Sequence, residues 1–579
     1  MSDQLSRRLV YFFEAVLVFT FLCSFCLVIW KGLHGIDLTD QAGYMSMAVR
    51  IAYGETPFVD EIMLHQTFGL ILFILYKPFL WISESNDYLV LYSNLLYTFF
   101  LLLNCYLSIQ ALKKIISIPK LMGIMTPYVA FLFVVGLSYN TMMLGFMLTS
   151  VSYLVSCYQD PSNSSKKLLV SGFFLGMAIT SYTPLFFINI VVFPSLIIFY
   201  KKEKVIVFKT WVLGQLIGGI PLMYAIIKAG PKAVITSISM SKAMAPVAGG
   251  NSKFSLMWNY FLDGLHPWYP LVVFLVGATY LLYRSYKYKY VYLMFYTSVF
   301  SFCMTFFDSK YNLDLISNSF LFCTFILMMI RKDKVELRPL ISFSLPVLLS
   351  LILFISYIST NAIISGIYGI ILILIFTTLF VIKGTQINLK NEDHKEFKLS
   401  LTSLIIIIPM FLGFFMRTYK FTYRDGKVAE LTAIVSKGPY KGIRTLPVKK
   451  EFLDELVELN KTYVASGDLV AYYNTIPAGY LTSRNRSAVC GAIIYNPYRE
   501  GVHRKHYLEC VRNKLHLNKK MVFFRLKRNA RDAYLKPVPE DFFEPDPFDR
   551  ALRSCVDKEL HKGQFWDIFT IQRNCLSGS

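Results

Sequence analysis

The stretch VYFFEAVLVFTFLCSFCLVIW, from Val10 to Trp30, carries a single charged residue among apolar ones and decides the fold class. An α-helix needs about 20 apolar residues to cross the hydrocarbon core of a bilayer. Similar apolar runs recur at Leu89–Leu112 and Ile352–Ile382. The first run follows Arg8 and lacks a small-residue cleavage site, so we expect a retained helix rather than a signal peptide. The runs together predict a polytopic α-helical membrane protein.

The composition agrees with this class. The 579 residues are 55% hydrophobic and 17% charged, with a mean hydropathy of +0.47. The formal net charge of +22 could indicate a nucleic-acid partner. Much of it lies in short loops between apolar segments, however, where the positive-inside rule explains it. We therefore expect a lipid bilayer around the protein and no nucleic acid.

The basic loops orient the chain. With the N-terminus in the cytoplasm, the connections Lys113–Lys120, Lys201–Lys209 and Arg331–Arg338 all fall inside. Residues 67–82 then form a helix in or dipping into the outer interface, and residues 168–200 form two short spans. The exact number of spans at these two places stays open. This orientation predicts about 13 transmembrane helices, beginning near residues 8, 89, 119, 141, 168, 184, 205, 269, 290, 314, 338, 362 and 399.

The composition changes after Met416. Residues 1–416 are expected to form the transmembrane module, which includes a long first outer loop at 31–88. Residues 417–579 are polar and follow an odd number of crossings, so we predict a small extracytoplasmic α/β domain. Strands are expected at Gly442–Leu446, Asp468–Tyr473 and Met521–Leu526, with an amphipathic helix at Lys450–Tyr463.

Cysteine placement bears on the same domain. Six of the 10 cysteines lie in the expected spans, where they pack as small apolar residues. The other four, in an oxidising compartment, would form two disulfides with three possible pairings. Four free thiols in a cytosolic domain are the alternative. These cysteines are Cys490, Cys510, Cys555 and Cys575.

The first outer loop holds the densest group of polar residues next to the membrane. Within it Tyr44, Met47, Ala48 and Ile51 recur at helical spacing. This apolar stripe predicts a short helix along the membrane surface. Asp40 stands at its start, where it could cap the helix by accepting a backbone N–H. It could equally act as a base on an acceptor hydroxyl, and one carboxylate could do both.

The segment Asp40-Gln41-Ala42-Gly43-Tyr44-Met45-Ser46-Met47-Ala48, followed by Gly54-Glu55-Thr56-Pro57-Phe58, resembles the first-loop motif of GT-C fold glycosyltransferases. These include protein O-mannosyltransferases and the aminoarabinose transferases of lipid A. Gln41 stands where the family usually has a second acidic residue. Segments Gly438–Ile443 and Ile476–Leu481 are similar to the C-terminal domains of bacterial members.

The resemblance implies a GT-C type membrane glycosyltransferase of the bacterial inner (plasma) membrane. Such an enzyme would move a sugar from a polyprenyl-phosphate-linked or polyprenyl-diphosphate-linked donor to a glycan, lipid or protein acceptor outside the cytoplasm. Asp40 would be the general base, and a single displacement would invert the anomeric carbon. The next outer loop, Gly136–Asn140, has no acid, so we expect no metal cofactor. A divalent ion held with Asp37, Asp60 or Glu61 is the alternative.

Other residues are candidates for substrate binding. The leaving phosphate needs positive charge, and the expected outer cations are Lys228, Lys232, Lys242, Lys253, Lys310, Arg417 and Arg424. Lys310 and Arg417 are preferred because they lie close to span ends. The full set of predicted substrate-binding residues is Asp37, Tyr44, Asp60, Glu61, His65, Gln66, Tyr139, Asn140, Lys310 and Arg417.

Three other classes of protein remain as alternatives. A transporter or flippase of a lipid-linked saccharide would carry acids within its spans and show repeated helices. An O-antigen polymerase or ligase would typically depend on a large late outer loop. A non-catalytic assembly protein would bind a partner through its external domain. The Asp40 loop favours the glycosyltransferase over all three.

Overall fold

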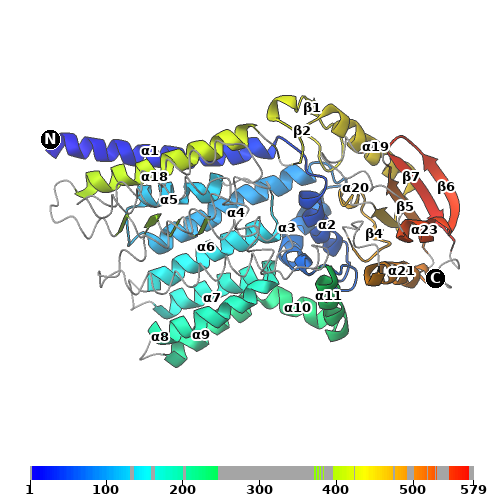
Figure 1. Ribbon diagram of the computed structural model, residues 1–579, viewed down its shortest axis with the longest axis horizontal. Helices are drawn as coiled ribbons and strands as arrows, with labels where there is room; N and C mark the ends of the chain where they lie inside the picture. The colour runs from blue at the N-terminus through cyan, green and yellow to red at the C-terminus, as the bar shows by residue number, and fades with distance from the viewer. Residues whose placement is uncertain are drawn as a thin grey trace, which may run out of the picture.

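The computed structural model describes residues 3–130, 136–157, 164–199, 204–244, isolated positions between 371 and 383, 395–420, 422, 424–473, 476–491, 501–517, 519–527, 530 and 547–572. Figure 1 shows a bundle of long helices at one end of the molecule and a mixed helix–sheet region at the other. The first described helix begins at the far end of the bundle, and the last described strand lies in the sheet at the opposite end (Figure 1).

Three helices of the described residues are long and apolar enough to cross a membrane. They lie in α1 (Asp3–Gly32), α4 (Leu89–Leu112) and α6 (Tyr139–Cys157). A pair bent by 58°, α9 (Lys204–Gly218) and α10 (Ile220–Ala229), gives a fourth if it is counted as one span. The crossings expected near residues 269, 290, 314, 338 and 362 lie outside the described residues. The total of about 13 therefore stays a prediction.

The remaining described helices of the bundle pack around these. They are α5 (Ile118–Ala130), α7 (Ser164–Ser181), η3 (Thr183–Ile188), α8 (Asn189–Phe199), α11 (Pro231–Met244) and α18 (Lys395–Lys420). Figure 1 shows α1 and α18 side by side along one edge. Lys120 ties α5 to both of them, because its Nζ lies 2.8 Å from Glu14 on α1 and 2.7 Å from Glu396 on α18.

Glycine brings α7 and α9 into backbone contact. Gly172 and Gly176 on α7 repeat at a four-residue spacing, as do Gly214 and Gly218 on α9. A Cβ placed at any of the four would collide with a backbone carbonyl oxygen of the partner helix. Small residues at this spacing let membrane helices approach closely. Close packing is important there because lipid provides no hydrophobic driving force for helix association.

The first outer loop folds into α2 (Asp40–Ala52), η1 (Leu64–Phe68) and α3 (Gly69–Ile82). With 14 residues, α3 extends only about 21 Å, less than the roughly 30 Å of a hydrocarbon core. The expectation that α2 lies along the membrane surface stays a prediction, but its apolar stripe packs against protein. No residue of the helix is exposed, because it is enclosed between α3 and α20 (Gly479–Thr482) of the C-terminal region (Figure 1).

The C-terminal region is a mixed α/β structure. A two-stranded pair, β1 (Ala433–Ile434) and β2 (Arg444–Thr445), precedes a five-stranded sheet of order β4-β3-β5-β7-β6. Strand β3 pairs in parallel with β4 and β5, whereas β5, β7 and β6 pair antiparallel. The sheet strands are β3 (Leu469–Tyr473), β4 (Arg486–Ser487), β5 (Met521–Leu526), β6 (Val556–Lys562) and β7 (Trp566–Ile571).

Short helices accompany the sheet. They are η7 (Val428–Glu430), α19 (Pro447–Tyr463), α21 (Gly501–Leu515) and α23 (Pro547–Arg553). The predicted strands at 468–473 and 521–526 and the helix at 450–463 are confirmed, and the strand expected at 442–446 is limited to β2. The division of the chain at residue 416 stays a prediction.

Cys490 and Cys510 form a disulfide with their Cα atoms 6.0 Å apart. Cys555 is also disulfide-bonded, and Cys575 lies outside the described residues. The expectation of oxidised cysteines in this region is therefore confirmed for three of the four. The pairing Cys490–Cys510 fixes α21 to the segment that follows β4.

Candidate active site at the start of α2

The N-terminus of α2 is capped by Asp37 rather than by Asp40. One carboxylate oxygen of Asp37 accepts the Thr39 N–H at 3.0 Å and the Thr39 hydroxyl at 2.7 Å, and the other accepts the Gln41 N–H at 2.9 Å. Asp37 is 4% exposed. The interpretation of Asp40 as the cap is therefore wrong, and Asp37 is occupied in holding the helix start. The Asp40 carboxylate is directed at Arg424 instead.

Asp40 forms an ion pair with Arg424, which comes from the far side of the sequence. Asp40 Oδ1 lies 3.0 Å from Arg424 Nη1, and each side chain is about a third exposed, at 32% and 33%. The Arg424 guanidinium also donates to the Thr39 hydroxyl. A carboxylate and a guanidinium are thus brought together at a partly exposed place.

A buried lysine fixes the backbone that carries Arg424. Lys449 donates from Nζ to the carbonyl oxygens of Arg424 and Ile36, each at 2.9 Å, and lies 3.2 Å from Asp425. Asp425 accepts the Ile36 N–H and the Thr445 hydroxyl, both at 2.7 Å. Burial lowers the pKa of Lys449, although the charge of Asp425 opposes that effect. The start of the first outer loop and the turn after α18 are therefore one rigid unit.

Aromatic rings cluster near Asp40. The Tyr139 ring meets that of Tyr44 edge-on at 5.3 Å and stacks on that of Tyr182 at 5.5 Å, while Tyr44 meets Phe68 edge-on at 5.7 Å. Asp40 is close enough to act electrostatically on Tyr139. The neighbouring Asn140 is 8% exposed, and its Oδ1 has no hydrogen-bond partner. The half-buried rings of Tyr44 and Tyr139 suit contact with the apolar face of a ligand.

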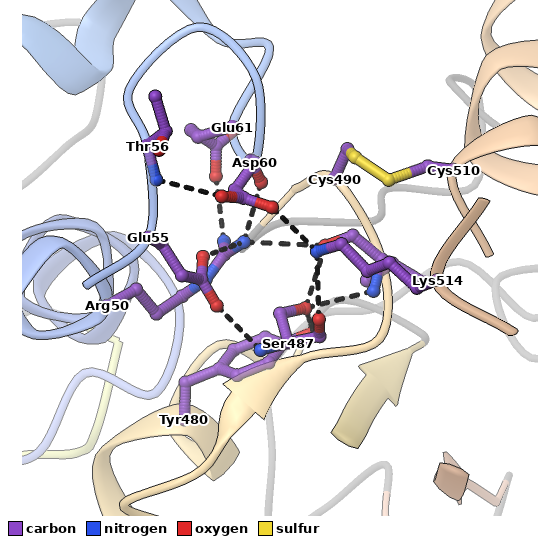
Figure 2. Close-up of a disulfide and its surroundings, with 11 residues drawn as sticks. Arg50, Glu55, Thr56, Asp60, Glu61, Tyr480, Ser487, Cys490, Cys510 and Lys514 are labelled. Atoms are coloured by element: carbon purple, nitrogen blue, oxygen red, sulfur yellow. Dashed lines mark hydrogen bonds and ion pairs between the residues drawn. A yellow bond between two sulfur atoms is a disulfide. The ribbon is translucent and has the colours of Figure 1, made fainter. Parts of the chain in front are cut away.

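A second charged cluster lies at the other end of α2, about 15 Å along the helix axis, and is shown in Figure 2. Arg50 is 2% exposed and pairs with Glu55 at 2.7 Å and with Glu61 at 3.0 Å. It donates to the Asp60 carbonyl at 2.7 Å and lies 5.0 Å from the centre of the Tyr480 ring. Although burial lowers the pKa of Arg50, the two glutamates hold it above its usual value.

The C-terminal region completes this cluster. Lys514 on α21 pairs with Asp60 at 2.8 Å and donates to the Ser487 carbonyl at 2.9 Å. The Ser487 N–H in turn donates to Glu55 at 2.6 Å. Figure 2 shows the disulfide of Cys490 and Cys510 beside these groups. Helix α2 is therefore held by the C-terminal region at both ends.

The two segments that resemble bacterial C-terminal domains dock on the first outer loop. In the first segment, Pro439 accepts the Val90 N–H at 3.0 Å, and Lys441 pairs with Asp87 at 3.1 Å. In the second, Tyr480 covers Arg50, and the Leu481 carbonyl accepts from Asn86 Nδ2 at 2.7 Å. Both segments therefore contribute to the joint between the two parts of the chain.

The structure separates the predicted substrate-binding residues into groups. Tyr44, Tyr139 and Asn140 lie near Asp40, whereas Asp60 and Glu61 belong to the Arg50 cluster. Gln66 is buried and bonds the Phe58 N–H and the Glu61 carbonyl, each at 2.8 Å. His65 lies in η1 and Arg417 in α18, and the side chains of both lie outside the described ones. Lys310 is also outside the described residues.

Arg424 is the site residue that sequence reasoning undervalued. It was one of seven candidate outer cations, and residues closer to span ends were preferred over it. No group of three or more histidine, cysteine, aspartate or glutamate side chains that could hold a metal occurs among the described residues. The expectation of a metal-free site stays a prediction.

Comparisons with known proteins give a fold-level likeness. No protein-family model matches the chain, and no curated protein matches it. Similar solved structures include the crystal structure of ArnT from Cupriavidus metallidurans bound to undecaprenyl phosphate, with 9% identity and a TM-score of 0.46, covering 98% of each chain. A TM-score below 0.5 transfers no donor, acceptor or site residue to this chain.

Proposed function

We propose that the protein is an integral membrane glycosyltransferase of the bacterial inner membrane. It moves a sugar from a polyprenyl-phosphate-linked donor to a hydroxyl of a cell-surface glycan, lipid or protein. The reaction takes place on the extracytoplasmic side, where the C-terminal region also lies. Asp40 takes the proton of the acceptor hydroxyl, Arg424 neutralises the lipid phosphate that leaves, and a single displacement inverts the anomeric carbon.

The observation that carries this proposal is the different use of the acids in the first outer loop. Asp37 caps α2, and Glu55 and Glu61 are buried against Arg50. Asp40, in contrast, is about a third exposed beside a guanidinium, with 32% of its side chain accessible. A carboxylate that a substrate can reach, next to a cation suited to phosphate, supplies the two groups that transfer from a phosphate-linked sugar requires.

The surroundings of Asp40 support a sugar substrate. Tyr44 and Tyr139, which are half-buried near Asp40, offer aromatic surface for a sugar ring.

Transfer by purified protein tests the proposal. The full chain in lipid nanodiscs is incubated with radiolabelled polyprenyl-phosphate sugars and with glycan, lipid and peptide acceptors. Asp40→Asn keeps the shape of the side chain and removes its charge, so we expect a loss of about 100-fold or more in rate. Glu84→Gln is the matched control, because Glu84 is an exposed acid of the same loop.

Three outcomes are informative. Transfer by Asp40→Asn at the wild-type rate would refute the role of the base. Asp37→Asn should instead lower the folded yield, because it removes the helix cap. Failure with every donor, together with solute uptake into vesicles, would favour the transporter alternative.

A further inference from the structure

Arg424 has an unusual backbone that its neighbours hold in place. Its φ angle of +54° is one that residues other than glycine rarely adopt. Lys449, which is 2% exposed, donates to its carbonyl at 2.9 Å, and the adjacent Asp425 accepts the Ile36 N–H at 2.7 Å. Strained residues of this kind gather at functional sites, where the surrounding structure over-determines them. The backbone is fixed, and the partly exposed side chain is the part that can turn.

The guanidinium of Arg424 is now directed at Asp40. The two charged groups are 3.0 Å apart, and a carboxylate beside a guanidinium is a weaker base than one without such a partner. The planar fork of an arginine also fits a phosphate group, to which it can donate two parallel hydrogen bonds. Donor phosphate and Asp40 therefore compete for one cation.

We propose that the phosphate of the lipid-linked donor draws Arg424 away from Asp40, so that Asp40 becomes an effective base only when the donor is bound. This inference rests on the proposed function and adds a binding order to it, with the donor first and the acceptor second. The acceptor oxygen then forms a bond to the anomeric carbon while its proton passes to Asp40. The bond between that carbon and the phosphate oxygen breaks, and its electron pair stays on the phosphate, which Arg424 neutralises.

Chemical labelling of Asp40 tests the inference without turnover. The full chain in nanodiscs is treated with a water-soluble carbodiimide and an amine, and the peptide that contains Asp40 is followed by mass spectrometry. Separate samples contain undecaprenyl phosphate, undecaprenol or inorganic phosphate. We expect undecaprenyl phosphate to raise the labelling rate several-fold and undecaprenol to leave it unchanged. Acceleration by inorganic phosphate would assign the effect to the phosphate group itself and would also support the inference.

Two variants complete the experiment. Arg424→Gln should label fast in every sample, because its Asp40 has already lost the cation. Lys427→Gln removes an exposed positive charge three residues further on and should behave as wild type. The inference fails if undecaprenyl phosphate slows or does not change wild-type labelling, or if undecaprenol accelerates it equally.

A separate measurement tests the proposed function itself. That function fails if the Asp40→Asn variant transfers sugar at the wild-type rate. A protein that needs Asp40 for transfer, yet shows no phosphate-dependent labelling, would remain a glycosyltransferase without this binding order.

Discussion

Replacing Arg50 with methionine removes a buried cation that three segments share. Its guanidinium is 2.7 Å from Glu55 and 3.0 Å from Glu61, and it also donates to the Asp60 carbonyl at 2.7 Å. Methionine fills much of the same space but offers no donor. Two buried carboxylates then lose their main counter-charge, and a carbonyl loses its hydrogen bond.

The magnitude follows from these losses. Removing one partner of a buried ion pair costs about 3–5 kcal/mol, and a carbonyl left without a donor costs about 1–3 kcal/mol more. Lys514 also acts electrostatically on Glu55 and compensates in part, so we expect a net loss of about 4 kcal/mol. For a cooperative unit the size of the C-terminal region, this corresponds to a fall in melting temperature of about 10 °C.

Differential scanning fluorimetry in detergent measures the effect. Lys461→Met is the control, since Lys461 is 67% exposed on α19 and its loss should shift the melting temperature by no more than about 2 °C. Combining Arg50→Met with Glu55→Gln and Glu61→Gln removes the uncompensated charges and should restore part of the stability. A shift no larger than that of Lys461→Met, or a triple variant less stable than the single one, would refute the reasoning.

Gly218→Val should abolish the folded peak in size-exclusion chromatography, because any Cβ there collides with the Phe173 carbonyl of α7; an unchanged peak would contradict the close helix contact. Burial raises the pKa of Asp60, but the charge of Lys514 outweighs this and holds it below the usual 3.8. The stabilisation is thus complete above pH 3.8 and lost as the pH falls below that value, so the melting temperatures of wild type and Asp60→Asn should converge as the pH falls below 3.8. Millimolar EDTA should leave transfer unchanged, and its abolition would reveal a metal.

Local patterns in the sequence predicted the elements that depend on local chemistry. The apolar runs at 10–30 and 89–112 are α1 and α4, because burial in lipid needs only length and hydropathy. The alternating and helical patterns of 450–473 and 521–526 likewise gave α19, β3 and β5. In each case the information lies within one stretch of chain.

Sequence patterns could not predict the contacts between distant segments. Asp37, and not Asp40, caps α2 because of the way the turn before the helix closes. Residue spacing alone does not define the shape of that turn. The Arg424 side chain bonds Thr39, which is 385 positions away in the sequence, and pairs with the adjacent Asp40. The apolar spacing of α2 predicted a helix on the membrane surface. Such spacing cannot reveal that the C-terminal region covers the polar face of the helix as well. The disulfide pairing was open for the same reason.

The docking of α2 at both ends has a consequence for biogenesis. Arg50 is made early, yet it donates to the Val489 carbonyl, 439 residues later in the chain. At about 5–20 residues per second, roughly 20 to 90 s pass before the ribosome has made both partners. During that interval the charges of the first loop are incompletely matched, so a nascent or truncated chain lacks the finished site. The charged network around Arg50 is therefore complete only after Val489 and Lys514 have been made.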